Sequence, residues 1–108
     1  MTARLASGIW VSAYLRRMQM ACIPAYVIAR GDATAGAVLV KLTLMNGVAK
    51  VYSRVFDMEQ DAHVWQVLIE GAEPDVDAAI ARQRRHDPDI WVIEVEDAHG
   101  RDLLNAMP

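Results

Sequence analysis

Apolar residues recur at helical spacing near the beginning of the chain. Over residues 8–22 they fall on one broad face, while small and polar side chains lie opposite. Ser7 is suited to cap this helix, and Pro24 is suited to end it because the residue before a proline disfavours helical backbone. The predicted buried face of the helix consists of Trp10, Val11, Tyr14, Leu15, Met18, Ala21 and Cys22.

Two β-rich runs, residues 37–45 and 48–57, are joined by Asn46-Gly47. This dipeptide tolerates the positive φ angles of a two-residue hairpin turn, so Met45 is predicted to pair with Val48. The face expected to lie under the helices carries Val38, Val40, Leu42 and Leu44 opposite Val55, Ser53, Val51 and Ala49. The other face, called here the outer hairpin face, carries Ala37, Leu39, Lys41, Thr43, Lys50, Tyr52, Arg54 and Phe56.

The rest of the chain alternates between strand and helix patterns. Residues 25–30, 62–69 and 89–96 are predicted strands, and a second helix begins at Pro74-Asp75 and runs to about Arg85. The order is αββββαβ. We therefore predict the α+β class, with a mixed, mostly antiparallel sheet of about five strands and two helices on one face. The length indicates a single domain, residues 1–108.

Charge and cysteine content limit the classes of partner and the cellular compartment that the sequence favours. The formal net charge of −3 disfavours nucleic acid as an obligate partner. A single cysteine forms no internal disulfide, so an oxidising compartment is not indicated. The apolar stretch 5–15 is too short to span a bilayer, and Arg16 and Arg17 follow it where a signal peptide would have its cleavage site. We expect a cytoplasmic protein without membrane association.

The acidic segment HDPDIWVIEVEDAH, residues 86–99, is the best candidate for chemistry. Glu94 and Glu96 project from one face of the predicted strand, about 7 Å apart. With His99 they could hold a divalent cation. The segment is similar to the cores of metal-dependent nucleases, although the usual lysine is missing. The simpler interpretation is a charged strand face neutralised by Arg82, Arg84 and Arg85.

The outer hairpin face offers a second possibility. It interleaves the cations Lys41, Lys50 and Arg54 with Tyr52 and Phe56. A sheet with cations and aromatic rings can bind single-stranded nucleic acid. The alternative is a half-exposed sheet in which Lys41 lies on the ring of Tyr52.

No catalytic motif is found. Cys22 has no histidine nearby in the sequence and lies on the apolar face of the first helix, so core packing explains it better than nucleophilic chemistry. His63, His86 and His99 show no metal-ligand spacing. Trp10, Trp65 and Trp91 are expected to anchor the core or an interface. We predict no catalytic residue and no cofactor.

Three stretches together carry a resemblance to a known family. They are IWVSAYLRR (residues 9–17), GAVLVKL (residues 36–42) and HDPDIWVIEVED (residues 86–97), followed by Gly100-Arg101. In these the chain resembles a family of short bacterial proteins known as domain of unknown function 1491. The resemblance spans nearly the whole chain and implies a stand-alone bacterial protein. It implies no activity, cofactor or site.

The leading hypothesis is a small, non-catalytic cytoplasmic protein that acts through protein–protein contacts and forms a homodimer. The dimer would use the outer sheet face, with Leu39, Tyr52 and Phe56, or a minor apolar stripe on the first helix. That stripe contains Ile9, Ala13 and Met20, beside Arg16 and Arg17. A further protein partner is possible. The alternatives are a metal-dependent enzyme or ion-binding protein using Glu94 and Glu96, and a nucleic-acid-binding module using the Lys41/Tyr52 face.

Overall fold

The computed structural model describes residues 5–107, with every side chain in that range except that of Phe56. Its elements follow the predicted order αββββαβ and end in a short 3₁₀ turn. They are α1 (Ser7–Met20), β1 (Ala25–Ala29), β2 (Val38–Thr43), β3 (Val48–Asp57), β4 (Ala62–Ala72), α2 (Glu73–His86), β5 (Trp91–Glu96) and η1 (Leu104–Ala106).

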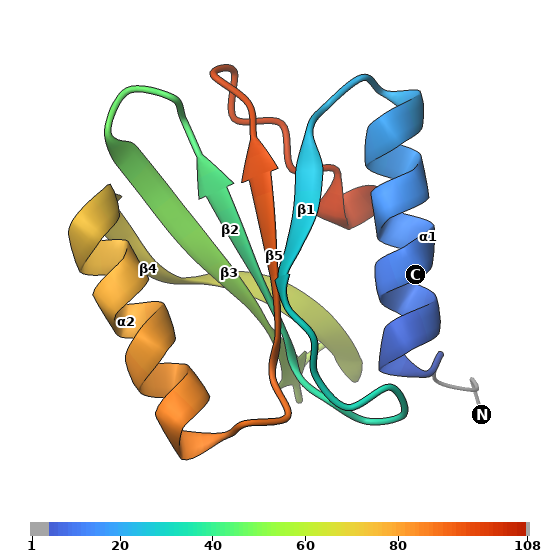
Figure 1. The fold of residues 1–108 in the computed structure, drawn as a ribbon. Coiled ribbons are helices and arrows are strands. Elements are labelled where there is room, and N and C mark those ends of the chain that lie inside the picture. The colour runs from blue at the N-terminus through green and yellow to red at the C-terminus, as the bar shows by residue number, and fades with distance from the viewer. Residues whose placement is uncertain (1–4, 108) are drawn as a thin grey trace.

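The five strands form one mixed sheet in the order β1-β5-β2-β3-β4 (Figure 1). The last strand, β5, lies between β1 and β2. It runs parallel to β2, while the other three neighbouring pairs are antiparallel. The α+β class and the mostly antiparallel sheet are confirmed. No helix in the described part of the chain is long and apolar enough to cross a membrane.

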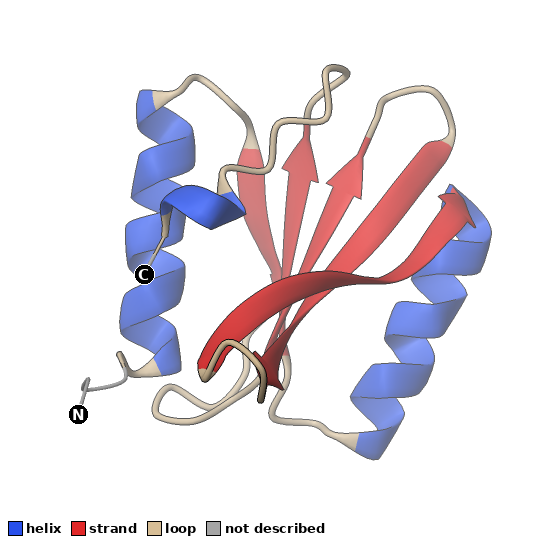
Figure 2. Ribbon diagram, turned by 180° about the vertical axis from the view of Figure 1, so that it is seen from behind, coloured by secondary structure: helices blue, strands red, loops and turns tan. Residues whose placement is uncertain are grey.

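The two helices cover opposite faces of the sheet, so the prediction that both lie on one face was wrong. In Figures 1 and 2, α1 lies beside β1 and α2 lies beside β3 and β4. The face toward α1, called the α1 face, packs Val40, Leu42, Trp91, Ile93 and Val95 against Trp10, Val11, Tyr14 and Met18. The face toward α2, called the α2 face, packs Leu39, Ala49, Val51 and Val92 against Val76 and Ile80.

The predicted hairpin register was wrong by one residue. Leu44 N donates to Val48 O at 3.0 Å, so the loop has three residues, with Met45 and Gly47 at positive φ. Asn46 Oδ1 accepts from Val48 N, and Gly47 O accepts from Glu73 N at the start of α2. These contacts hold the longer loop. A one-residue slip exchanges the faces of one strand relative to its partner.

With the shifted register, the residues of the outer hairpin face are divided between the α1 face and the α2 face of the sheet. Lys41 now pairs with Val51 on the α2 face, and Tyr52 pairs with Val40 on the α1 face. Leu42 and Val51 are both fully buried, as predicted, but on opposite sides of the sheet. The predicted orientation of the Phe56 side chain lies outside the described residues.

The first helix, α1, begins and ends at other residues than the sequence predicted. Ser7 does not cap it, because its hydroxyl donates to Gly36 O at 2.6 Å and the helix begins at Ser7 itself. The helix ends at Met20, two residues earlier than predicted, and Cys22 has a φ of 57°. Cys22 is therefore exposed, which corrects its predicted place in the core. The burial of Trp10 and Trp91 is confirmed.

Candidate functional site

The structure gives each of the predicted metal ligands a different environment. Glu94 lies on the α2 face, where its Oε1 is 3.1 Å from Lys41 Nζ. Glu96 is engaged by Tyr26, whose pKa is raised chiefly by the hydrogen bond to Glu96. His99 is exposed in the turn after β5. Among the described residues no group of three or more histidine, cysteine, aspartate or glutamate side chains is arranged to hold a metal ion.

Lys41 is the centre of the charged cluster on the α2 face. Its side chain is 5% exposed, and Nζ lies 2.8 Å from Glu73 and 2.7 Å from Asp77 in addition to the contact with Glu94. Burial alone lowers the pKa of Lys41, but hydrogen bonds to Asp77, Glu73 and Glu94 outweigh it and raise the pKa. The parallel pairing of β2 with β5 thus places Lys41 directly beside Glu94 of the acidic segment.

The ammonium group of Lys41 is the positive charge that neutralises this cluster. Three carboxylates converge on it from α2 and β5, within hydrogen-bonding distance. These ion pairs join α2 to the sheet through a buried ammonium group and partly exposed carboxylates. Among the described residues the ion pair of Glu94 is with Lys41, and not with Arg82, Arg84 or Arg85 as predicted. The structure therefore supports a structural role for Glu94.

A second charged group closes the turn after β5. Asp97 is buried and receives Arg101 Nε at 3.0 Å, Arg101 Nη2 at 3.1 Å and the Arg101 backbone N–H at 2.6 Å. These bonds from Arg101 hold the pKa of Asp97 down to about 2. The C-terminal segment is fastened further along, where Tyr14 Oη donates to Asp102 O at 2.7 Å. These contacts are internal to the fold.

The surface where α1 meets β1 is the best candidate for contact with another molecule. The sheet order leaves β1 at an edge, hydrogen-bonded on one side to β5. A groove of about 870 Å³ runs between α1 and β1. Ile9 is 59% exposed and Met20 is 77% exposed, which confirms that the minor stripe lies outside the buried face of the helix. We call this region the α1–β1 edge.

Polar and apolar groups alternate along the α1–β1 edge. Its groove is lined by Ile9, Ser12, Ala13, Leu15, Arg16, Gln19, Ile23, Pro24, Ala25 and Tyr26. A neighbouring hollow of about 440 Å³ is lined by Ala13, Arg16, Arg17, Met20, Ala21 and Leu103. Two further β1 side chains, Tyr26 and Ile28, are about half exposed, at 47% and 55%. Sequence reasoning found the helical stripe but missed β1, because its place at the edge depends on the insertion of β5.

Comparison with proteins of known structure gives the same fold. A crystal structure of a DUF1491 family protein from Caulobacter crescentus CB15 matches with a TM-score of 0.86 and 40% identity, over 97% of this chain and 98% of that one. An NMR structure of a family protein from the same organism matches with a TM-score of 0.83 and 39% identity, over 99% and 97%.

A solution structure of a protein from A. tumefaciens matches with a TM-score of 0.74 and 29% identity, over 87% of this chain and 86% of that one. No curated protein matches the chain. The model of the family described as "Protein of unknown function (DUF1491)" matches residues 5–105. The match spans both helices and all five strands, and the chain belongs to the DUF1491 family.

Proposed function

We propose that this protein is a non-catalytic protein of the cytoplasm that acts through protein–protein contacts, the first of them with a second copy of itself. The observation that carries the proposal is the free edge of β1 beside the exposed apolar stripe of α1. An edge strand presents unpaired backbone groups that can pair with another strand. Exposed apolar side chains next to it add area that is buried on association.

The proposed dimer joins two β1 strands antiparallel across a two-fold axis. The two sheets then become one, and the two α1 helices lie side by side on the same face. Ser12 and Ala13 lie in the middle of α1 and are exposed. Small side chains there allow the helices to approach closely.

The charges of α1 fit an antiparallel arrangement. The helix carries Arg16 and Arg17 and contains no acidic residue. With the axis near Ser12 and Ala13, Arg16 lies beside Ile9 of the partner subunit rather than beside a second arginine. The apolar stem of Arg16 can cover that isoleucine while its guanidinium stays in water. Arginines at the rim then set register more than affinity.

The state of Cys22 supports the cytoplasm. Cys22 is an exposed free thiol. Exposed thiols persist in a reducing compartment and are oxidised outside it.

Light scattering at micromolar concentration tests the dimer. The wild-type protein should have about twice the 12.0 kDa mass of the chain. Met20→Glu should give a monomer, because it places a charge in the helix contact. Met58→Glu is the matched control, since Met58 is 86% exposed in the β3–β4 turn, away from this edge. A wild-type monomer, or equal loss of mass in both variants, would refute the proposal.

Cross-linking tests the arrangement of the helices. In a Cys22→Ser background, Ala13→Cys should form an intermolecular disulfide on mild oxidation, because the two-fold axis brings the two copies of position 13 together. Ala78→Cys, at an exposed position on α2, should remain reduced under the same conditions. Equal cross-linking at both positions would mean random collision and would exclude this geometry.

A further inference from the structure

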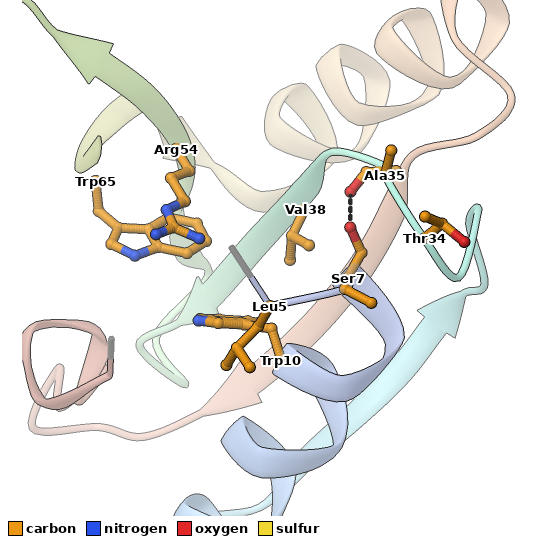
Figure 3. Close-up of a pocket in the computed structure, with 10 residues that line it drawn as sticks. Leu5, Ser7, Trp10, Thr34, Ala35, Val38, Arg54 and Trp65 are labelled. Carbon is orange, nitrogen blue, oxygen red and sulfur yellow. Dashed lines mark hydrogen bonds between the residues drawn. The ribbon is translucent and has the colours of Figure 1, made fainter. Parts of the chain in front are cut away.

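A separate pocket of about 310 Å³ lies between the beginning of α1 and strands β2, β3 and β4 (Figure 3). Its walls combine apolar and polar groups, and its size is at the lower end of the range of small-molecule sites. Among the described residues the pocket is lined by Leu5, Ala6, Ser7, Trp10, Thr34, Ala35, Gly36, Val38, Arg54 and Trp65.

One wall of the pocket is held in place by a network of hydrogen bonds. Ser7 Oγ donates to Gly36 O, the dashed line in Figure 3. Ser7 N donates to Thr34 O, and the two bonds tie the loop before β2 to the helix. Asp32 Oδ2 accepts from Thr34 N and Ala35 N within the same loop. A Cβ on Gly36 would overlap the carbonyl oxygen of Asp89. The wall is therefore preformed.

The opposite wall contains a buried hydrogen-bond donor without an acceptor. Trp10 is 2% exposed, and its Nε1–H has no partner within the described part of the chain. Its ring is 5.0 Å from that of Tyr14 and 5.2 Å from that of Trp65. Leaving such a donor unpaired costs about 1–3 kcal/mol. The contrast is Trp91, whose Nε1 donates to Asp32 O at 2.8 Å.

The charge at the pocket has one sign. Arg54 contributes to the lining, and none of the described lining residues is acidic. Arg54 is the direct cross-strand neighbour of Trp65, and Figure 3 shows both side chains on the side of the pocket where the Trp10 nitrogen lies. A guanidinium group offers several donors, so one of them can take an anion while others keep different contacts.

We propose that this pocket binds a small organic anion, a carboxylate carried by a flat apolar group. The carboxylate accepts from Trp10 Nε1–H and from the guanidinium of Arg54. The apolar group lies against Trp65 and Val38. The Trp10 nitrogen is covered by its neighbours, so the ligand displaces the partly buried ring of Trp65 as it enters. This site is independent of the α1–β1 edge.

The indole N–H signals in a proton–nitrogen correlation NMR spectrum test the proposal, with phenylacetate as the probe. The three tryptophans give three such signals, and Trp10→Phe assigns the first. Phenylacetate should shift the Trp10 signal downfield in a saturable manner, because the N–H gains an acceptor. Trp91, already bonded, should not move. Phenylacetamide, which has the same shape without the charge, should bind at least about tenfold more weakly.

Two surface variants locate the anion. Arg54→Gln should weaken phenylacetate binding about tenfold, because it removes the charged hydrogen bond. Arg82→Gln, an exposed arginine on α2, should leave the binding unchanged. The proposal is overturned if the Trp10 signal shows no saturable shift. It is equally overturned if the acid and the amide bind alike, or if the two arginine variants behave alike.

Discussion

The two faces of the sheet each bury a polar group whose pairing differs sharply, Lys41 on the α2 face and Trp10 on the α1 face. On the α2 face, Lys41 is 5% exposed and meets three carboxylates that remain partly in contact with water. On the α1 face, Trp10 is similarly buried, yet its N–H has no partner among the described residues 5–107. A full charge must find partners because its desolvation costs several kcal/mol, whereas one neutral N–H can be left unpaired at a smaller cost.

Neighbouring residues of strand β2 point to opposite faces of the sheet and pack in different cores. Val40 and Leu42 point to the α1 face, and Lys41 between them points to the α2 face. The α2 face uses its charges to hold a helix in place. The α1 face holds its helix by aromatic packing and keeps a donor that a ligand can use. Stability and binding are therefore expected to respond to different mutations on the two faces.

The largest effect is expected for Lys41→Met. The variant leaves Glu73, Asp77 and Glu94 close together without their cation, so the free energy of unfolding should fall by about 3 kcal/mol. Chemical denaturation measures it. The control is Lys50→Met, since Lys50 is more exposed and lies 3.8 Å from Glu70. It should cost no more than about 0.5 kcal/mol. Equal losses of stability in the two variants would show that the Lys41 cluster contributes no more than an exposed ion pair.

The two buried tryptophans should differ when each is replaced by phenylalanine. Trp91→Phe loses the hydrogen bond to Asp32 O and weakens the contact of the ring with Arg30, now at 5.2 Å. Trp10→Phe removes an N–H that has no partner in the described chain. Both lose similar volume, so Trp91→Phe should be more destabilising by about 1–2 kcal/mol. A larger loss for Trp10→Phe would contradict the unpaired state of its N–H.

The faces should also contribute independently to stability. Tyr14→Phe removes the hydrogen bond to Asp102 O on the α1 face and should cost about 1 kcal/mol. Tyr14 and Lys41 share no partner, so the double variant with Lys41→Met should equal the sum of the single ones within about 0.5 kcal/mol. A larger discrepancy in the double-mutant cycle would mean that the two interiors are coupled through the sheet.

Local patterns predicted the elements, and distant contacts decided how they fit together. Asn46-Gly47 located the hairpin, but the bond from Glu73 N to Gly47 O belongs to a helix that begins much later in the chain. The register, and with it the separation of Lys41 from Tyr52, was therefore not predictable from the turn alone. Lys41 within the apolar run VLVKLT was the available signal that a buried cation needed carboxylates.

The sites depended on strand order in the same way. Glu94 meets Lys41 because β5 inserts beside β2, and the same insertion leaves β1 at the edge. Periodicity does not specify strand order, since each strand shows the same alternation wherever it lies in the sheet. The family resemblance was confirmed over residues 5–105. It gave no site to compare with these.

The last and smallest effect concerns the ionisation of the tyrosines that pack on the α1 face. It should change stability only at alkaline pH, where tyrosines lose their protons. Burial raises the pKa of Tyr14, and it raises that of Tyr52 to about 12. The folded protein therefore keeps protons that the unfolded chain loses above about pH 10. Unfolding then releases protons, so stability should be level near neutrality and fall as the pH rises from about 10 to 12.

Urea unfolding across this pH range, together with tyrosinate absorbance, measures the fall. The raised pKa of Lys41 acts in the same direction, so the contribution of the α1 face has to be isolated by substitution. Tyr52→Phe should make the alkaline fall shallower, because one group that resists ionisation in the folded state is gone. If Tyr52→Phe leaves the slope unchanged while Lys41→Met removes it, the alkaline limit belongs to the α2 face instead.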